Sequence, residues 1–317
     1  MRVAGGLVAG AALAMAGAMG ACQGTNSAKP LVVFNAAALG PAFRALGDLS
    51  RSRPTGFILQ QENAPSLEAI RKLTDLGRMP DVLGTADVAL FDLLIVPAYS
   101  SWYVVFATNA LVLAYGPQSA GRADLSADSW YRVLLRPEVR VGRSDPGVDP
   151  SGYRTLLALQ LAERHYGEPG LAARLLAAMP ERYMRHAEAD LSALLQAGEF
   201  DYIWTYRNLA RAHHLAYLEL PPEINLADPA RGSWYAQARV RIATGPPGDS
   251  LTLRGAPIAF AVTVPRGAPH PDAARSFVTL LLSQRGADVL RAAGFEPLSP
   301  VRVVGQPPTG WGALVAR

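Results

Sequence analysis

The chain has 317 residues, of which 50% are hydrophobic and 18% are charged. This balance excludes an intrinsically disordered chain, and the length favours about two domains. The formal net charge is only +4, and the arginines are scattered instead of forming a dense basic run. Nucleic acid is therefore not an expected partner.

The first 21 residues are typical of an export signal. Arg2 precedes a short apolar run that ends in small residues before Cys22, the single cysteine of the sequence. The run is too short to span a membrane comfortably, and "MGAC" resembles a bacterial lipoprotein cleavage box. We therefore expect a lipoprotein signal at 1–21, lipidation of Cys22 and a polar tether at 22–30. An ordinary cleaved signal and an uncleaved anchor are the alternatives.

From residue 31 the sequence pattern alternates strands and helices. Short apolar strands are expected at 31–35, 56–62 and 81–87, with helices at 40–53 and 66–77 between them. This order predicts a parallel sheet with helices on both faces. A long extended segment follows at 102–116 and has a break at Thr108-Asn109.

A second long extended segment, 257–268, follows a central α/β block and leads into a C-terminal helix pair. Two such segments on either side of a central block indicate a two-domain hinge protein. We expect lobe 1 to comprise 31–112 plus 257–317, and lobe 2 to comprise 113–256. In open α/β sheets ligands bind beyond the carboxyl ends of the strands. The corresponding loops are 35–39, 62–66, 84–87, 144–151 and 204–206.

The stretch "RSDPGVDPSGYR", residues 143–154, predicts the start of a helix. Asp149 suits the N-cap, and Pro150 suits the first helical position. A helix N-terminus attracts anions because its first N–H groups have no partner within the helix. A carboxylate at the lip of such a site is unusual for simple anion binding, and taken alone Asp149 is more simply explained as an N-cap.

Several segments resemble the tungstate/molybdate-binding lipoproteins of ABC importers, in collinear order over almost the whole mature chain. The most distinctive are "SDPGVDPSGYR" and "ELPPEINLADP". The resemblance implies an α/β, two-lobed periplasmic-binding-protein-like fold of type II. Each lobe would be a mixed sheet flanked by helices, and two hinge strands would join the lobes.

The resemblance also implies a function. The protein would be an exported monomer, lipid-anchored to the cell membrane and facing the periplasm or the cell exterior. It would capture tungstate or molybdate between its lobes and deliver the oxyanion to an ABC transporter permease and its ATPase. It would need no cofactor besides this ligand.

The site residues follow from the same resemblance. Asp149 and Glu188 match two carboxylates that the family places against the metal of the oxyanion, which becomes six-coordinate. Such carboxylates repel sulfate and phosphate, whose central atoms do not readily accept further oxygen ligands. Donors to the oxyanion would come from Ser66, Tyr206 and, mainly through its backbone N–H, Ser151.

The sequence departs from the family pattern in the first loop, where Ala37 and Ala38 replace the usual Gly-Ser and remove one hydroxyl donor. Ser151 also stands where a cysteine is common, and Pro65 where a glycine is usual. Simpler interpretations remain open for three of the site residues. Glu188 could be a solvated first-turn acid, Ser66 a plain N-cap and Tyr206 a core residue. Further positive charge could come from Arg140, Arg143 and Arg185.

Two other classes of function were weighed. An enzyme is not expected, because no G-x-S-x-G, phosphate-binding-loop or zinc motif is present. His213 and His214 are adjacent and so do not share a helix face, which disfavours a transition-metal site. The remaining alternative keeps the fold but makes the protein a sensor or a binder of a different small anion, which the Ala37-Ala38 replacement favours.

Overall fold

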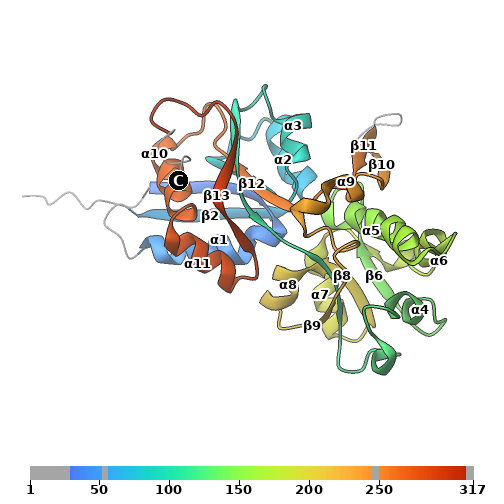
Figure 1. Ribbon diagram of the computed structural model, residues 1–317. Helices are drawn as coiled ribbons and strands as arrows, with labels where there is room; N and C mark the ends of the chain where they lie inside the picture. The colour runs from blue at the N-terminus through green and yellow to red at the C-terminus, as the bar shows by residue number, and fades with distance from the viewer. Residues whose placement is uncertain (1–28, 52–55, 244–249, 312–317) are drawn as a thin grey trace, which may run out of the picture.

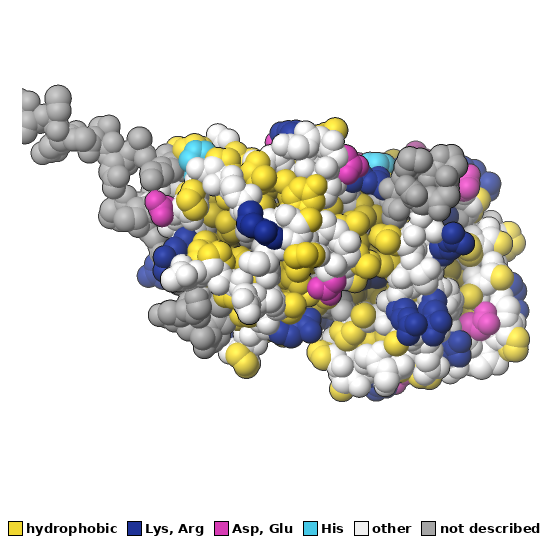
Figure 2. Space-filling view, turned by 90° about the horizontal axis from the view of Figure 1, so that it is seen from above, with side chains coloured by type: hydrophobic (Ala, Val, Ile, Leu, Met, Phe, Trp, Pro, Cys, Tyr) yellow, Lys and Arg dark blue, Asp and Glu magenta, His cyan; other side chains and the backbone are white. Residues whose placement is uncertain are grey.

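The structure is a computed structural model that describes residues 29–51, 56–243 and 250–311. The expected signal sequence, Cys22 and most of the tether lie outside these residues. Within the described ranges, no helix combines the length and the apolar character that a membrane crossing needs. The elements form two lobes (Figure 1). On the face shown in Figure 2, Lys and Arg side chains stand in separate groups across both lobes.

Lobe 1 is built on a six-stranded sheet with the order β13-β4-β12-β3-β1-β2. β1 (Lys29–Ala36) pairs in parallel with β2 (Phe57–Ala64) and β3 (Val82–Thr85), as the alternating pattern predicted. β12 (Ala259–Thr263) lies antiparallel between β3 and β4 (Trp102–Thr108), and β13 (Glu296–Gly305) pairs with β4. Both ends of the described chain therefore contribute to one sheet.

The helices of lobe 1 bury one apolar face each against this sheet. Leu67, Ile70 and Leu73 recur at helical spacing and form part of the buried face of α2. The Phe277 ring packs edge-on against Phe43 and Phe57, with centroid separations of 5.0 and 5.7 Å. The elements are η1 (Ala37–Leu39), α1 (Gly40–Arg51), α2 (Ser66–Thr74), α3 (Ala89–Leu94), α10 (Pro271–Leu281) and α11 (Gln284–Ala292).

Lobe 2 is built on a five-stranded mixed sheet with the order β7-β6-β8-β5-β9. Its strands are β5 (Leu111–Tyr115), β6 (Val141–Ser144), β7 (Met184–Arg185), β8 (Tyr202–Tyr206) and β9 (Ala216–Glu219). Its main helices are α4 (Trp130–Leu134), α5 (Pro150–Tyr166), α6 (Leu171–Ala177), α7 (Glu188–Gln196), α8 (Arg207–Ala212) and α9 (Gly232–Tyr235). A hairpin, β10 (Arg239–Ala243) and β11 (Ser250–Arg254), contacts α5 through β10. Short 3₁₀ turns are η2 (Arg122–Asp124), η3 (Glu181–Tyr183) and η4 (Pro229–Arg231).

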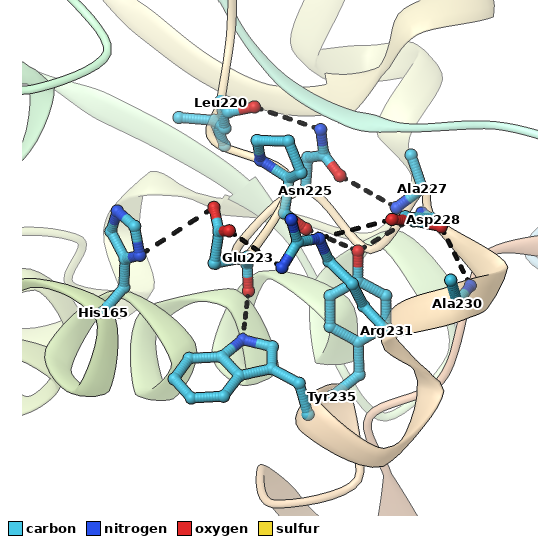
Figure 3. A network of polar contacts seen from close by, with 11 residues as sticks. His165, Leu220, Glu223, Asn225, Ala227, Asp228, Ala230, Arg231 and Tyr235 are labelled. Atoms are coloured by element: carbon cyan, nitrogen blue, oxygen red, sulfur yellow. Dashed lines mark hydrogen bonds and ion pairs between the residues drawn. The ribbon is translucent and has the colours of Figure 1, made fainter.

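The chain passes between the lobes at 109–110, at the predicted break, and again just before β12. Residues 220–235, which we call the hinge clasp, contact both passages. The Asn225 carbonyl accepts from the Leu111 N–H at 2.9 Å in the first passage. The Leu226 carbonyl accepts from the Ile258 N–H at 2.7 Å in the second. Within the clasp, Arg231 lies between Glu223 (2.9 Å) and Asp228 (3.3 Å), as Figure 3 shows. The distinctive "ELPPEINLADP" block therefore builds the connection between the lobes.

Candidate functional site

Asp149 joins the starts of two helices. It is the N-cap of α5, with Oδ1 accepting the Ser151 N–H at 3.0 Å and Pro150 at the first helical position, which confirms the predicted helix start. Its other oxygen, Oδ2, accepts the backbone N–H of Glu188, the first residue of α7, at 3.0 Å. Asp149 is therefore a cap and, in addition, a direct neighbour of Glu188.

Glu188 lies beside the end of β8. Its Oε1 accepts two hydrogen bonds, from the Thr205 hydroxyl and from the Tyr206 backbone N–H, both at 2.6 Å. The residue is 2% exposed, so the interpretation of Glu188 as a solvated acid is wrong. Its position at the helix N-terminus favours a carboxylate electrostatically.

Both carboxyl groups have pKa values above their ordinary values. Burial raises the pKa of Glu188 to about 8, and the charge of Asp149 adds to the effect. Burial also raises the pKa of Asp149, to about 6, against the lowering effect of its two backbone hydrogen bonds. Desolvation and like charge both disfavour the ionised form. The fold therefore holds two acids together in a place where burial disfavours the ionised form of each.

Lobe 1 brings Ser66 to this region from the start of α2. The N-cap of α2 is Pro65, so the interpretation of Ser66 as a plain N-cap is wrong. The Ser66 Oγ accepts the Ala86 N–H at 3.1 Å, and Ser66 is 1% exposed. Since the oxygen accepts this bond, the hydroxyl proton is available for another acceptor.

Ala37 and Ala38 lie in η1, which contacts α7. The Ala38 carbonyl accepts from the Asn208 side chain of α8 at 2.7 Å, so this loop of lobe 1 is bonded to lobe 2. The structure thus brings the first loop to the same interface as the other site residues.

Ser151 differs from the expectation in one respect. Its backbone N–H, expected as the donor to the ligand, already donates to Asp149. Its Oγ is buried and has no hydrogen-bond partner among the described residues. Buried hydroxyl groups are usually satisfied, so the Oγ is the group of Ser151 that is available to a ligand.

Arg154 was not expected at the site; it is 3% exposed and connects the lobes. Its Nη1 donates to the Ala86 carbonyl (2.6 Å) and to the Tyr206 hydroxyl (2.7 Å). Its Nη2 lies 3.3 Å from Asp87 Oδ2, which also accepts the Tyr153 hydroxyl at 2.6 Å. A cation near the start of a helix opposes the helix dipole. The unfavourable position of the arginine in "GYR" was the signal in the sequence that could have identified Arg154 as a site residue.

The three arginines that could have supplied further positive charge have other partners. Arg140 lies 3.4 Å from Asp201, Arg143 donates to the Met179 carbonyl, and Arg185 donates to backbone carbonyls of its own turn. By contrast, the charge of Arg154 lowers the pKa of both Asp149 and Glu188 against the larger effect of burial. Arg154 is therefore a cation that acts on both members of the pair.

Further contacts close the two lobes on one another. The Leu67 N–H of α2 donates to the Val148 carbonyl at 3.3 Å, and His186 lies 3.0 Å from Glu68 across the same gap. Among the loops expected at the cleft, 62–66 and 84–87 are bonded directly through Ser66 and Ala86. The loop 144–151 is bonded to α2 through Val148, and 204–206 is connected through Arg154 and Glu188. The loop 35–39 is connected to α8 through Asn208. His213 and His214 lie at the end of α8 instead, and no group of three metal-ligating side chains occurs in the part of the chain that the structure describes.

Residues 31–296 match the family described as bacterial extracellular solute-binding protein. The chain belongs to this family. A solute-binding protein of Petrotoga mobilis is 37% identical over 85% of this chain and 84% of its own length. The molybdate/tungstate-binding protein WtpA of Pyrococcus abyssi is 32% identical over 90% of this chain and 89% of its own.

Solved structures show the same fold at low sequence identity. The periplasmic molybdate-binding protein of Azotobacter vinelandii aligns with a TM-score of 0.58 at 15% identity, covering 84% of this chain and 98% of that chain. The sulfate-binding protein SubI of Mycobacterium tuberculosis aligns with a TM-score of 0.60 at 14% identity, covering 91% and 89%. The protein is accordingly a two-lobed solute-binding protein of the ABC-importer type and not an enzyme.

Proposed function

We propose that this solute-binding protein captures tungstate or molybdate between its lobes and delivers the oxyanion to an ABC permease. The observation that carries the proposal is the buried pair of Asp149 and Glu188 at the interface between the lobes. Asp149 accepts a hydrogen bond from the backbone N–H of Glu188, which places the two carboxyl groups close together. Two acids whose pKa values are raised by burial are costly for the free protein. A ligand that bonds to both carboxylates offsets that cost.

The pair explains selectivity among oxyanions. A carboxylate that faces sulfate or phosphate is only repelled, because sulfur and phosphorus in these ions do not readily accept more oxygen ligands. Hexavalent tungsten and molybdenum are larger and accept them, so the same carboxylates become ligands. Repulsion of the common anions and attraction of the rare ones then come from the same two residues. The name of the Pyrococcus abyssi relative agrees with this choice of ligand.

The donors around the oxyanion are the hydroxyl groups that the structure leaves with a free proton or without a partner. Ser66 approaches from lobe 1, and Ser151 and Tyr206 approach from lobe 2. Ala37 and Ala38 can offer only backbone N–H groups. Burial raises the pKa of Tyr206 well above its ordinary value, so its hydroxyl keeps the proton that it donates.

Calorimetry on the mature chain with tungstate, molybdate, sulfate and phosphate tests the proposal. We expect the first two anions to bind and the last two to bind far more weakly. X-ray absorption on the tungstate complex should report about six oxygen neighbours instead of about four. Equal competition by sulfate, together with four neighbours, would overturn the proposed ligand.

A second candidate is a sensor or a carrier of a different small anion. The observation that favours it is the missing hydroxyl at Ala37-Ala38. Tighter binding of phosphate or sulfate in the same titrations would support the different ligand. A neighbouring sensor-kinase gene would support the sensor, and a neighbouring permease and ATPase gene pair would support transport.

The organisation of the mature protein is part of the proposal. Residues 31–110 with 257–317 form lobe 1, and 111–256 form lobe 2. The boundary differs from the one expected at 112–113 because β5 pairs with β8 and β9 of lobe 2. The chain is a monomer that is exported by the signal at 1–21. It is held at the cell membrane through a lipid on Cys22 and the tether at 22–30.

A further inference from the structure

We propose that Arg154 is a positioning residue that makes anion binding depend on lobe closure. Lobe 1, through Ala86 and Asp87, holds the guanidinium group against the Tyr206 hydroxyl and thereby directs the Tyr206 O–H towards the ligand. The inference rests on the proposed function, in which Tyr206 donates to the bound oxyanion.

The first step is the direction of one hydrogen bond. A guanidinium group can only donate, so in its 2.7 Å contact with Arg154 the Tyr206 oxygen must be the acceptor. The hydroxyl proton of Tyr206 must then point to a different acceptor. Without Arg154 the same hydroxyl could rotate and present its oxygen to the anion, which would repel it.

The second step is the dependence on lobe 1. Arg154 and Tyr206 both belong to lobe 2, on α5 and β8, but the other acceptors of Arg154 belong to the loop after β3. These are the Ala86 carbonyl at 2.6 Å and Asp87 Oδ2 at 3.3 Å. When the lobes separate, both contacts are lost and the guanidinium group has only Tyr206. The full set of acceptors exists in the closed arrangement alone.

Tyr153 reinforces the same contact. Its hydroxyl donates to Asp87 Oδ2 at 2.6 Å. The same carboxylate oxygen of lobe 1 is therefore in contact with two neighbouring residues of α5, Tyr153 and Arg154. A cavity of about 350 Å³ borders Asp87, Tyr153 and Arg154, and the Asp87 side chain is 13% exposed. Water can therefore replace these contacts on opening, so the ion pair can break and form again during each cycle of binding.

Ala86 connects the two hydroxyl donors, Ser66 and Tyr206. The Ala86 N–H donates to Ser66 Oγ, while the Ala86 carbonyl accepts from Arg154. One residue of lobe 1 thus sets the orientation of the Ser66 hydroxyl directly and that of the Tyr206 hydroxyl through Arg154. The Ser66 donor is therefore oriented within lobe 1 itself, and closure adds the oriented Tyr206 donor of lobe 2.

The experiment compares Asp87→Asn with Asp92→Asn. Asn at position 87 keeps an oxygen for the Ala89 N–H but loses the charge that holds Arg154. Asp92 is a matched control because it also accepts a tyrosine hydroxyl, from Tyr103 at 2.8 Å, but entirely within lobe 1. We expect Asp87→Asn to weaken tungstate binding about tenfold, chiefly through faster release measured by stopped-flow tryptophan fluorescence. Asp92→Asn should bind as the wild type does.

A double-mutant cycle with Tyr206→Phe separates positioning from general structural support. In the Phe variant there is no hydroxyl to orient, so adding Asp87→Asn should cost much less than it costs in the wild type. Arg154→Lys keeps the charge but has one nitrogen in place of Nη1 and Nη2, so it loses the fork geometry and should resemble Asp87→Asn. Strictly additive losses in the cycle, or equal effects of Asp87→Asn and Asp92→Asn, would overturn the inference. Absence of tungstate and molybdate binding by the wild type would instead overturn the proposed function.

Discussion

Asp149 and Glu188 use their oxygens differently, and this difference makes them separable by mutation. Glu188 accepts both of its hydrogen bonds on Oε1, so Gln can keep them. Asp149 uses Oδ1 for Ser151 and Oδ2 for Glu188, so Asn keeps only one of the two. The same neutralisation therefore has different structural costs at the two positions.

Glu188→Gln should leave the ligand-free protein at least as stable as the wild type at neutral pH, since it removes a buried acid without losing a bond. Asp149→Asn should lose about 1 kcal/mol for its missing acceptor. Both should weaken tungstate binding by about a hundredfold, which removes about 2.7 kcal/mol of ligand-induced stabilisation. Thermal melts with and without tungstate measure both quantities. A large loss of ligand-free stability in Glu188→Gln would mean that the residue is structural.

The pH dependence of stability follows from the raised pKa of Glu188. The folded-state value of about 8 exceeds the ordinary value of 4.5, so the folded protein binds a proton that the unfolded chain releases. The protonated Glu188 carboxyl therefore contributes to the free energy of unfolding at low pH, and this contribution is lost as the pH rises from about 4.5 to about 8. The melting temperature of Glu188→Gln minus that of the wild type should therefore increase as the pH rises through this window. A constant difference would show that Glu188 is ionised throughout.

Binding should release protons, because only ionised carboxylates can be ligands to the metal. Calorimetry at pH 7 in buffers of different ionisation enthalpy measures this release. An anion held by hydrogen bonds from neutral carboxylic acids would retain the protons or take up more. Proton uptake with tungstate would therefore contradict coordination by Asp149 and Glu188.

At the scale of single elements, the first turn of α5 decides the geometry of the site. A Cβ on Gly152 would lie 2.6 Å from the Ser144 carbonyl oxygen and from backbone atoms of Asp145 and Pro146. Only glycine lets the helix start so close to the loop that precedes it. Gly152→Ala should therefore displace Asp149 and Ser151 together.

We expect Gly152→Ala to destabilise the protein by about 1–3 kcal/mol and to abolish most tungstate binding. Gly232→Ala is the control, because this glycine also starts a helix but its added Cβ would meet only Pro257, at 4.0 Å. Urea unfolding and calorimetry of the two variants give the comparison. Equal stability of the two variants would show that the loop before α5 can move aside.

Much of the fold could be predicted because its signals are local. The parallel strands of lobe 1, the break at Thr108-Asn109 and the Asp149-Pro150 helix start were all predicted and confirmed. β13 was missed because Pro297 and Pro300 disfavour a strand. It tolerates both as an edge strand with an irregular register.

The site was less predictable, since its contacts join residues distant in sequence. Local sequence could assign Asp149 as a cap, but the bond to Glu188, 39 residues later, depends on the packing of α7 against β6. The role of Arg154 depends on a loop 68 residues earlier. Ser66 and Glu188 each had a simple local interpretation. The first is wrong because α2 is capped by Pro65, and the second is wrong because tertiary packing buries Glu188.

At the scale of the whole molecule, anchoring can be tested apart from binding. Cys22→Ala should yield a protein that is released into the soluble fraction or left as an uncleaved precursor, while the mature domain still binds tungstate. Two acyl chains are needed for firm attachment, and the mutation removes the residue that would carry them. Membrane fractionation with intact-mass measurement checks the outcome. A mutant of mature mass that stays with the membranes would exclude lipidation at Cys22.

The arrangement of the strands also determines which half of the molecule would move. β1 and β13 belong to the same sheet, so a chain fastened upstream of Lys29 is fastened through lobe 1. Lobe 2, which carries both acids, is covalently connected to it through the passages that the hinge clasp holds, and its other contacts with lobe 1 are noncovalent. A protein immobilised by its N-terminus on a sensor surface should consequently keep its full binding amplitude. A cross-link that fixes lobe 2 to the same surface should slow both capture and release.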